Sequence, residues 1–155
     1  TITSGSAASI APATWRDLNA LRHLEQVCFP LDAWPLWDLV GVLTFPNVVR
    51  LKGLSNGHLV GFVAADIRKA ESLAWISTIG VLPELRRQGI GAALLDACEA
   101  RLAVPRIRLS VRISNQAAIR LYTRRGYQRS DTWRRYYADS EDALVLEKAV
   151  GGNGL

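Results

Sequence analysis

Apolar and polar residues alternate along the chain with two periods, and each change of period marks the border of a predicted element. Leucines recur at helical spacing after Thr14-Trp15-Arg16-Asp17, which resembles a capping box with Asp in the place of the usual Glu. This pattern predicts a helix over about 15–28. Pro30 and Pro35 interrupt it, and a short second helix is predicted over 36–43.

The middle of the chain changes to a β-type pattern. The runs VVRLKGL and HLVGFVAADI flank Ser55-Asn56-Gly57, which is a strong signal for a β-hairpin turn. The apolar run LAWISTIGV at 73–81 predicts a buried strand. Side chains alternate again over 105–113, with apolar residues on one side, and this pattern predicts a further strand.

Helical patterns separate and follow these strands. One helix is predicted from the glycine-containing loop at 86–91 to about residue 103. A second helix is predicted to begin at Asn115 and to end at Gly126, where glycine favours a C-terminal stop. Two final strands are predicted over about 127–135 and 143–149.

The order of these elements predicts an α/β fold in which helices cover a mixed sheet. With 155 residues, of which 49% are hydrophobic, the chain is long enough for one compact domain with a substantial core. A single domain over 9–150 is therefore predicted, with a flexible N-terminus at 1–8 and a disordered tail at 151–155.

Cysteine usage and hydropathy narrow the class of protein. Cys28 and Cys98 lie on apolar faces of predicted helices and have neither the paired spacing of a metal site nor that of a disulfide framework. We therefore expect buried thiols and no metal. No apolar run reaches the roughly 18 residues of a membrane span, and the N-terminal residues have no basic region before an apolar stretch. The expectation is a soluble, reduced, cytoplasmic protein.

Positive charge is concentrated in one segment. The formal net charge is +5, yet residues 101–135 hold ten arginines and one acid, Asp131. Such a segment suits an anionic ligand or partner, and it equally suits a solvated surface on which arginine stems cover apolar area.

The loop Arg86-Arg87-Gln88-Gly89-Ile90-Gly91 is the clearest candidate for anion binding. It follows a predicted buried strand and opens a predicted helix, whose unpaired N–H groups attract phosphate. A P-loop would need Gly-Lys-Ser/Thr, which does not occur. A dinucleotide fingerprint would need glycine where Leu94 stands. The pattern that remains is Arg/Gln-x-x-Gly-x-Gly/Ala.

Together with three further segments, RRQGIGAALL resembles the GCN5-related N-acetyltransferase superfamily over most of residues 9–149. These segments are SNQAAIRLYTRRGY (114–127), RRYYADSEDALVLEK (134–148) and FPLDAW, which begins at Phe29. The last two segments are similar to those of protein N-terminal acetyltransferases, including the bacterial enzymes that acetylate the alanine terminus of a ribosomal protein. The resemblance implies a mostly antiparallel sheet of six to seven strands with a splayed strand pair and about four helices.

The resemblance also implies a site for acetyl-CoA as cosubstrate. The loop amides would hold the pyrophosphate and the main chain of the preceding strand would hold the pantetheine arm. The implied cofactor-binding residues are Ile79, Val81, Arg86, Arg87, Gln88, Gly89, Ile90, Gly91, Ala92, Asn115 and Tyr122. Asn115 also fits an ordinary helix N-cap, and both roles are compatible.

For catalysis, the resemblance implies direct attack of an amine on the thioester, with Tyr122 protonating the departing coenzyme A. A phenol with an ordinary pKa near ~10 is protonated at neutral pH, as a general acid must be. Where relatives carry a Glu or His base this chain has Ser110, and where some carry a tyrosine it has Trp75. Neither is a competent base. A water relay held by Ser110 or by backbone carbonyls would then serve. Asp32 and Glu25, near the substrate loop, are lesser candidates for the base and are expected to be surface acids.

The resemblance places the acceptor, a protein N-terminus, between Phe29-Pro30 and a hairpin that carries Tyr136 and Tyr137. The nearby acids Asp139, Glu141 and Asp142 would either attract a basic substrate or belong to a solvated turn. Other hypotheses remain: acetylation of a lysine or a small amine, binding of RNA through the arginines, or sensing of coenzyme A without catalysis.

Overall fold

The computed structural model of the chain describes residues 8–150. The flexible N-terminus predicted for 1–8 and the disordered tail predicted for 151–155 lie, except for Ala8, outside the described residues. Its α-helices are α1 (Leu18–Cys28), α2 (Leu36–Thr44), α3 (Ile90–Arg101) and α4 (Gln116–Arg124). Its strands are β1 (Ser9–Pro12), β2 (Val48–Ser55), β3 (His58–Arg68), β4 (Leu73–Val81), β5 (Arg106–Arg112), β6 (Gln128–Trp133) and β7 (Ala143–Ala149).

The seven strands form a mixed sheet in the order β1-β2-β3-β4-β5-β7-β6. The pair β4–β5 is parallel, and the pairs β1–β2, β2–β3, β5–β7 and β6–β7 are antiparallel. The prediction of an α/β fold with a mostly antiparallel sheet and four helices is therefore confirmed. The splay of the strand pair stays a prediction.

The described chain forms two compact units. The first contains the residues up to Asp66 together with Ser77–Leu102, and the second contains Ile67–Ile76 together with the residues from Ala103 onward. Strand β4 begins in the second unit and ends in the first. Among residues 8–150, no helix is long and apolar enough to cross a membrane.

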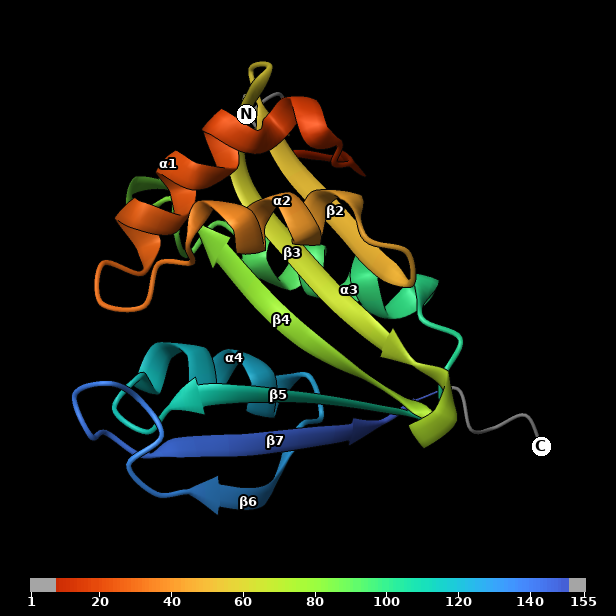
Figure 1. Cartoon of the computed structure of the whole chain (residues 1–155), viewed down its shortest axis with the longest axis vertical. Coiled ribbons are helices and arrows are strands. Elements are labelled where there is room, and N and C mark those ends of the chain that lie inside the picture. The colour runs from red at the N-terminus through yellow and green to blue at the C-terminus, as the bar shows by residue number, and fades with distance from the viewer. Residues whose placement is uncertain (1–7, 151–155) are drawn as a thin grey trace. The chain divides into compact units, whose positions relative to one another are not determined.

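In the first unit, α1 and α2 pack on one face of β3, and α3 lies on the other face (Figure 1). Leucines of α1 and α2 form a buried cluster with Phe62 and Ala64 of β3. On the opposite face, a Cβ at Gly61 would lie 2.9 Å from Leu94 of α3, so this glycine lets the helix approach the strand closely. The hairpin turn predicted at Asn56-Gly57 is confirmed, because both residues have positive φ as a type I′ turn requires.

In the second unit, β5 alternates between a buried and a half-buried face. Ile107, Leu109 and Val111 are buried as predicted, whereas Ile113, beyond the end of the strand, is 41% exposed. Strand β7 pairs with β5 on one side and with β6 on the other, and a register shift interrupts the β6–β7 ladder between Arg129 and Asp131.

Candidate active site

The loop that precedes α3 has the geometry expected of an anion-binding turn. Arg87 and Gly89 have left-handed backbones, with φ of 66° and 82°. The first hydrogen bond of the helix joins the Ala93 N–H to the Gly89 carbonyl at 2.9 Å, and no side chain caps the helix. The residues from Arg86 to Gly89 are exposed. The backbone of this loop is therefore open to a ligand, and a Cβ on Gly89 would meet no atom within 4 Å.

Two side chains, one from the loop and one from α1, donate to the main-chain carbonyl at the end of β4. The Nε of Arg86 donates to the carbonyl of Val81 at 3.1 Å, and the thiol of Cys28 donates to the same oxygen at 3.3 Å. A carbonyl has two lone pairs, so these donors occupy the acceptor capacity of Val81. Any contact of Val81 with the pantetheine arm would therefore use its N–H group.

The segment after α1 rests on the backbone of β4. A Cβ at Gly80 would lie 3.2 Å from the ring of Phe29, so the ring occupies the space that any larger residue would fill. Phe29 is half-buried and Pro30 is exposed. Gly80 thus sets the position of the segment that the sequence predicts to bind the acceptor.

The expectation that Glu25 is a surface acid is wrong. Glu25 lies in α1 with only 2% of its surface exposed, and it is the buried charged residue of the described core. Its Oε2 accepts a hydrogen bond from Thr78 Oγ1 at 2.8 Å, whereas Oε1 is buried with no partner. Burial raises the pKa of this carboxyl, and hydrogen bonds from Thr78 and from the Trp34 backbone oppose the rise. Helical spacing places Glu25 on the apolar face of α1, four residues after Leu21 and seven after Leu18, but its charge led to the expectation of a surface position.

Ser110 and Trp75, at which the resemblance implies that relatives have a base, both lie in the second unit. Ser110 is on the half-buried face of β5 and pairs with Val145. Trp75 lies in a stack of aromatic rings, 5.6 Å from Trp133, and the guanidinium of Arg68 lies 5.8 Å from its centroid. An indole held in this way contributes apolar surface and a ring face, and it has no basic nitrogen with which to accept a proton.

Helix α4 carries the two other predicted cofactor residues. Asn115 caps the helix, because its Oδ1 accepts a hydrogen bond from the Ala118 N–H at 3.2 Å. Tyr122 is 5% exposed and packs edge-on against Tyr127, with ring centroids 5.8 Å apart. Burial, with a smaller contribution from Tyr137, raises the pKa of Tyr122 well above its ordinary value. The phenol is therefore protonated at neutral pH, as the predicted general acid requires.

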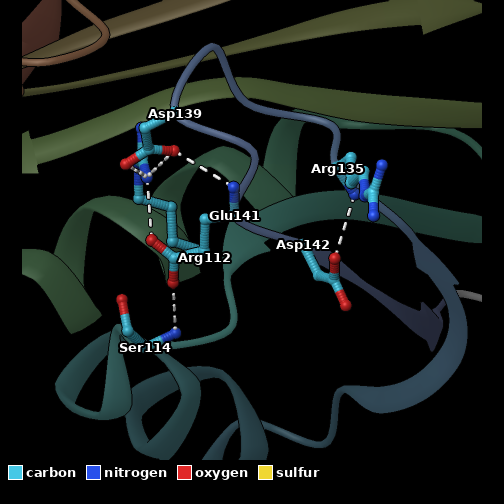
Figure 2. A network of polar contacts seen from close by, with 6 residues as sticks. All are labelled: Arg112, Ser114, Arg135, Asp139, Glu141 and Asp142. Atoms are coloured by element: carbon cyan, nitrogen blue, oxygen red, sulfur yellow. Dashed lines mark hydrogen bonds and ion pairs between the residues drawn. The ribbon is translucent and has the colours of Figure 1, made fainter.

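An ion-pair network fixes the loop between β6 and β7 (Figure 2). Arg112 Nη1 lies 2.9 Å from Asp139 Oδ2 and 2.8 Å from Glu141 Oε1. Glu141 Oε2 in turn accepts the N–H of Ser114, and Asp142 accepts the N–H of Arg135. Hydrogen bonds from the Glu141 N–H and then from Arg112 lower the pKa of Asp139, and those from Ser114 and then from Arg112 lower the pKa of Glu141. Because the carboxylates are engaged within the protein, the network supports a structural role for this acidic loop.

The same arginine reaches the predicted acceptor residues. The guanidinium carbon of Arg112 lies 4.2 Å from the centroid of Tyr137, and the rings of Tyr136 and Tyr137 are 5.0 Å apart at 87°. Tyr136 is 54% exposed. No specific role was predicted for Arg112. The available signal was its place at the end of a predicted strand, with an acidic loop later in the sequence.

Several arginines of the 101–135 segment are likewise engaged within the protein. Arg108 pairs with Glu147, and Arg106 lies 3.8 Å from the same carboxylate. Arg129 donates to the Thr132 hydroxyl at 2.7 Å. These contacts favour the interpretation of the segment as a solvated protein surface over that of a basic patch for a polyanion. Among residues 8–150, no three His, Cys, Asp or Glu side chains are grouped as a metal site requires.

The seven-stranded mixed sheet and its four helices are those of the GNAT class of acetyltransferases. The chain belongs to the acetyltransferase (GNAT) family, whose model matches residues 18–127.

Within this family, the chain is similar to proteins that are named for N-terminal acetylation. It is 40% identical to the N-alpha-acetyltransferase of Sulfurisphaera tokodaii, over 88% of this chain and 90% of the relative. The structure of the ribosomal-protein-S18-alanine N-acetyltransferase from Escherichia coli is similar with a TM-score of 0.82 and 29% identity, over 96% of this chain and 98% of that chain. The structure of Arabidopsis thaliana Naa50 in complex with the bisubstrate analogue CoA-Ac-MVNAL is similar with a TM-score of 0.80 and 26% identity. The similarity covers 92% of this chain and 99% of that chain.

Proposed function

We propose that this protein transfers the acetyl group of acetyl-CoA to the α-amine of a protein N-terminus. The observation that carries the proposal is the exposed loop at 86–89, with left-handed Gly89, directly before the uncapped start of α3 in a member of the GNAT family. The names of the similar proteins support the acceptor class, since the relatives from an archaeon and a bacterium are both N-terminal acetyltransferases.

The cosubstrate would be held by backbone groups of the first unit. The N–H groups of Ile90, Gly91 and Ala92 precede the first hydrogen bond of α3 and suit a pyrophosphate, to which the helix dipole adds a favourable field. Arg87 and Gln88 are exposed beside them and can add side-chain donors. Backbone groups of Ile79 and the N–H of Val81 are the proposed contacts of the pantetheine arm, with Asn115 as a further contact.

The chemical step needs one proton removed and one proton supplied. The amine nitrogen bonds to the thioester carbon, the carbon–sulfur bond breaks, and the departing sulfur takes a proton. Tyr122 is the proposed donor of this proton: its phenol is protonated at neutral pH, while burial raises its pKa and so makes it a weaker acid than a free phenol. Both Cys28 and Cys98 are thiols whose pKa is raised by burial, so neither is activated for attack as a thiolate. Direct attack by the amine therefore fits better than an acyl-enzyme.

Phe29-Pro30 in the first unit and the Tyr136-Tyr137 pair in the second are the residues proposed to contact the acceptor. Gly80 holds the first of these segments and Arg112 holds the second, so both have fixed positions within their units. Tyrosine rings offer an apolar wall for a small first side chain, together with hydroxyls for the peptide backbone. A ribosomal protein is a proposed acceptor, by similarity to the E. coli enzyme.

The proposal is tested by measuring thiol release from acetyl-CoA with a panel of peptides. The panel begins with Ala, Ser or Met, and each peptide is also made with a blocked N-terminus and an unchanged interior that contains one lysine. We expect release with free termini and only background release with blocked ones. Equal rates with free and blocked peptides would reject the α-amine as the acceptor and indicate the lysine side chain.

A further inference from the structure

Glu25 is a buried acid with no evident structural reason to be charged. It is 2% exposed, and only one of its two carboxylate oxygens is hydrogen-bonded by a side chain, that of Thr78. Oε1 is buried without a partner, and native proteins contain few such atoms. A glutamine or an apolar residue would fill this position of α1 without burying a charge. The unpaired oxygen therefore points to a role in binding or proton transfer.

The position of Glu25 connects it to the proposed acceptor segment. The Phe29 N–H donates to the main-chain carbonyl of Glu25 at 2.8 Å, and the Phe29 ring rests on Gly80, two residues after Thr78 in β4. Thus the carboxylate and the acceptor segment both contact the same short stretch of β4. All of these groups belong to the first unit.

The proposed reaction lacks a proton acceptor among the residues that the family pattern offers. Ser110 is neutral at any working pH, and Trp75 has no basic nitrogen. A carboxyl whose pKa is raised by burial is closer to the range of an effective general base than an exposed one. The titratable neighbour that interacts with Glu25 is the thiol of Cys28, on the same helix, and Arg86 and Glu84 in turn act on that thiol.

We propose that Glu25 accepts the proton that the acceptor α-amine loses during acetyl transfer, through one water molecule bound at Oε1. The nitrogen–carbon bond forms as the carbon–sulfur bond breaks. Before this attack, the ammonium form of the amine passes one proton through the water to the carboxylate. As the carbon–sulfur bond breaks, Tyr122 protonates the sulfur, and the second proton that the nitrogen loses restores the phenol. After product release, Glu25 returns its proton to solvent. This inference rests on the proposed function.

The test compares Glu25→Gln with the wild-type chain. Glutamine has the shape of glutamate and can still accept the hydrogen bond from Thr78, but it takes up no proton at working pH. With an alanine-first peptide, the kcat of the variant should be about a hundredfold lower at pH 7. The difference should narrow toward pH 9 to 10, because an α-amine with a pKa near ~8 is then neutral without help. A kcat within about threefold of wild type at pH 7, or a loss that is equal at every pH, would overturn the proposal.

Thr78→Val provides a matched second variant. It preserves the carboxylate and the side-chain volume but removes the hydrogen bond that lowers the pKa of Glu25. The acid limb of the kcat profile should therefore move to higher pH while the plateau is retained. An unmoved limb would contradict the proposal, and this variant decides the matter if Glu25→Gln does not fold. Thermal unfolding and coenzyme A binding verify that both variants are intact.

Failure of the proposed function has a different signature. If the wild-type chain acetylates only lysine side chains or a small amine, the acceptor class is wrong. The ratio of variant to wild-type rates is then measured with that amine. A loss of about a hundredfold, which shrinks as pH approaches the pKa of the amine, still supports Glu25 as the proton acceptor. A ratio that does not depend on pH overturns it.

Discussion

Replacement of Gly89 by alanine tests the backbone conformation of the proposed phosphate loop without introducing a steric clash. Gly89 has a φ of 82°, in the left-handed region that side chains rarely adopt. A Cβ at this position would meet no atom within 4 Å, so the added methyl group makes no clash in the free protein. The cost of the substitution is therefore the conformational cost of placing alanine in the left-handed region, about 1 kcal/mol.

Gly57 offers a matched control in the same unit. It has a φ of 79° in the β2–β3 hairpin, and a Cβ there would also meet no atom within 4 Å. Alanine at residue 57 therefore carries the same conformational cost as alanine at residue 89, without altering the loop before α3. Each variant should lower the midpoint of thermal unfolding by about 2–4 °C, which is the effect of about 1 kcal/mol in a chain of this size.

Coenzyme A affinity should distinguish the two variants. If Gly89→Ala relaxes out of the left-handed conformation in the free protein, binding must restore it, at a cost of about 1 kcal/mol. Because 1.4 kcal/mol corresponds to tenfold, calorimetry should give a Kd about fivefold weaker. The methyl group adds to this loss if it enters the space of the pyrophosphate. Gly57→Ala should bind coenzyme A as the wild-type chain does.

Two results would refute this reasoning. Unchanged affinity in a Gly89→Ala variant whose unfolding midpoint is also unchanged, and whose loop has therefore relaxed, would show that the loop amides do not hold the phosphates. Equal losses in the alanine variants at residues 89 and 57 would show that affinity follows global stability and not the geometry of the loop.

Three further predictions follow from the other parts of the site. Tyr122→Phe should lower kcat about a hundredfold while the calorimetric Kd for coenzyme A changes less than twofold, and unchanged turnover would remove the phenol from the mechanism. Arg112→Lys loses the planar guanidinium that faces Tyr137 and two carboxylates. The KM for peptide should therefore rise about fivefold, while kcat and coenzyme A affinity are retained. An unchanged KM would contradict the role of Arg112 in positioning the tyrosine pair. The pKa of Glu25 is raised in the folded chain, so protonated Glu25 contributes fully to stability when the pH is below its ordinary pKa. This contribution is lost as the pH rises through the raised pKa, because the buried side chain then becomes charged. Glu25→Gln should therefore unfold at a higher temperature than wild type at pH 7 to 8, and a lower temperature would argue against an uncompensated buried charge.

Local sequence signals predicted most of the fold, because they report on local conformation. Asn56-Gly57 specified its hairpin, Asn115 capped α4, and LAWISTIGV matched β4 from Leu73 to Val81. Strand β1 was missed. It has only four residues, and its conformation depends on pairing with β2, about 40 residues later in the chain.

The candidate site was predicted in part, and the missing parts depend on contacts between distant segments. The glycine loop and Tyr122 carry recognisable patterns. In contrast, the support of Phe29 by Gly80 and the pairing of Arg112 with Asp139 join residues 27 or more positions apart. The burial of Glu25 depends on how closely α1 approaches β4. A pattern along one helix gives no measure of that distance.

The position of the transferred acetyl group tests the central claim most directly. A peptide with an N-terminal alanine and one internal lysine is incubated with the protein and isotopically labelled acetyl-CoA, and tandem mass spectrometry locates the label. The proposed function predicts label on the alanine nitrogen. Label on the lysine Nζ, or no label under conditions where the protein binds coenzyme A, would contradict it.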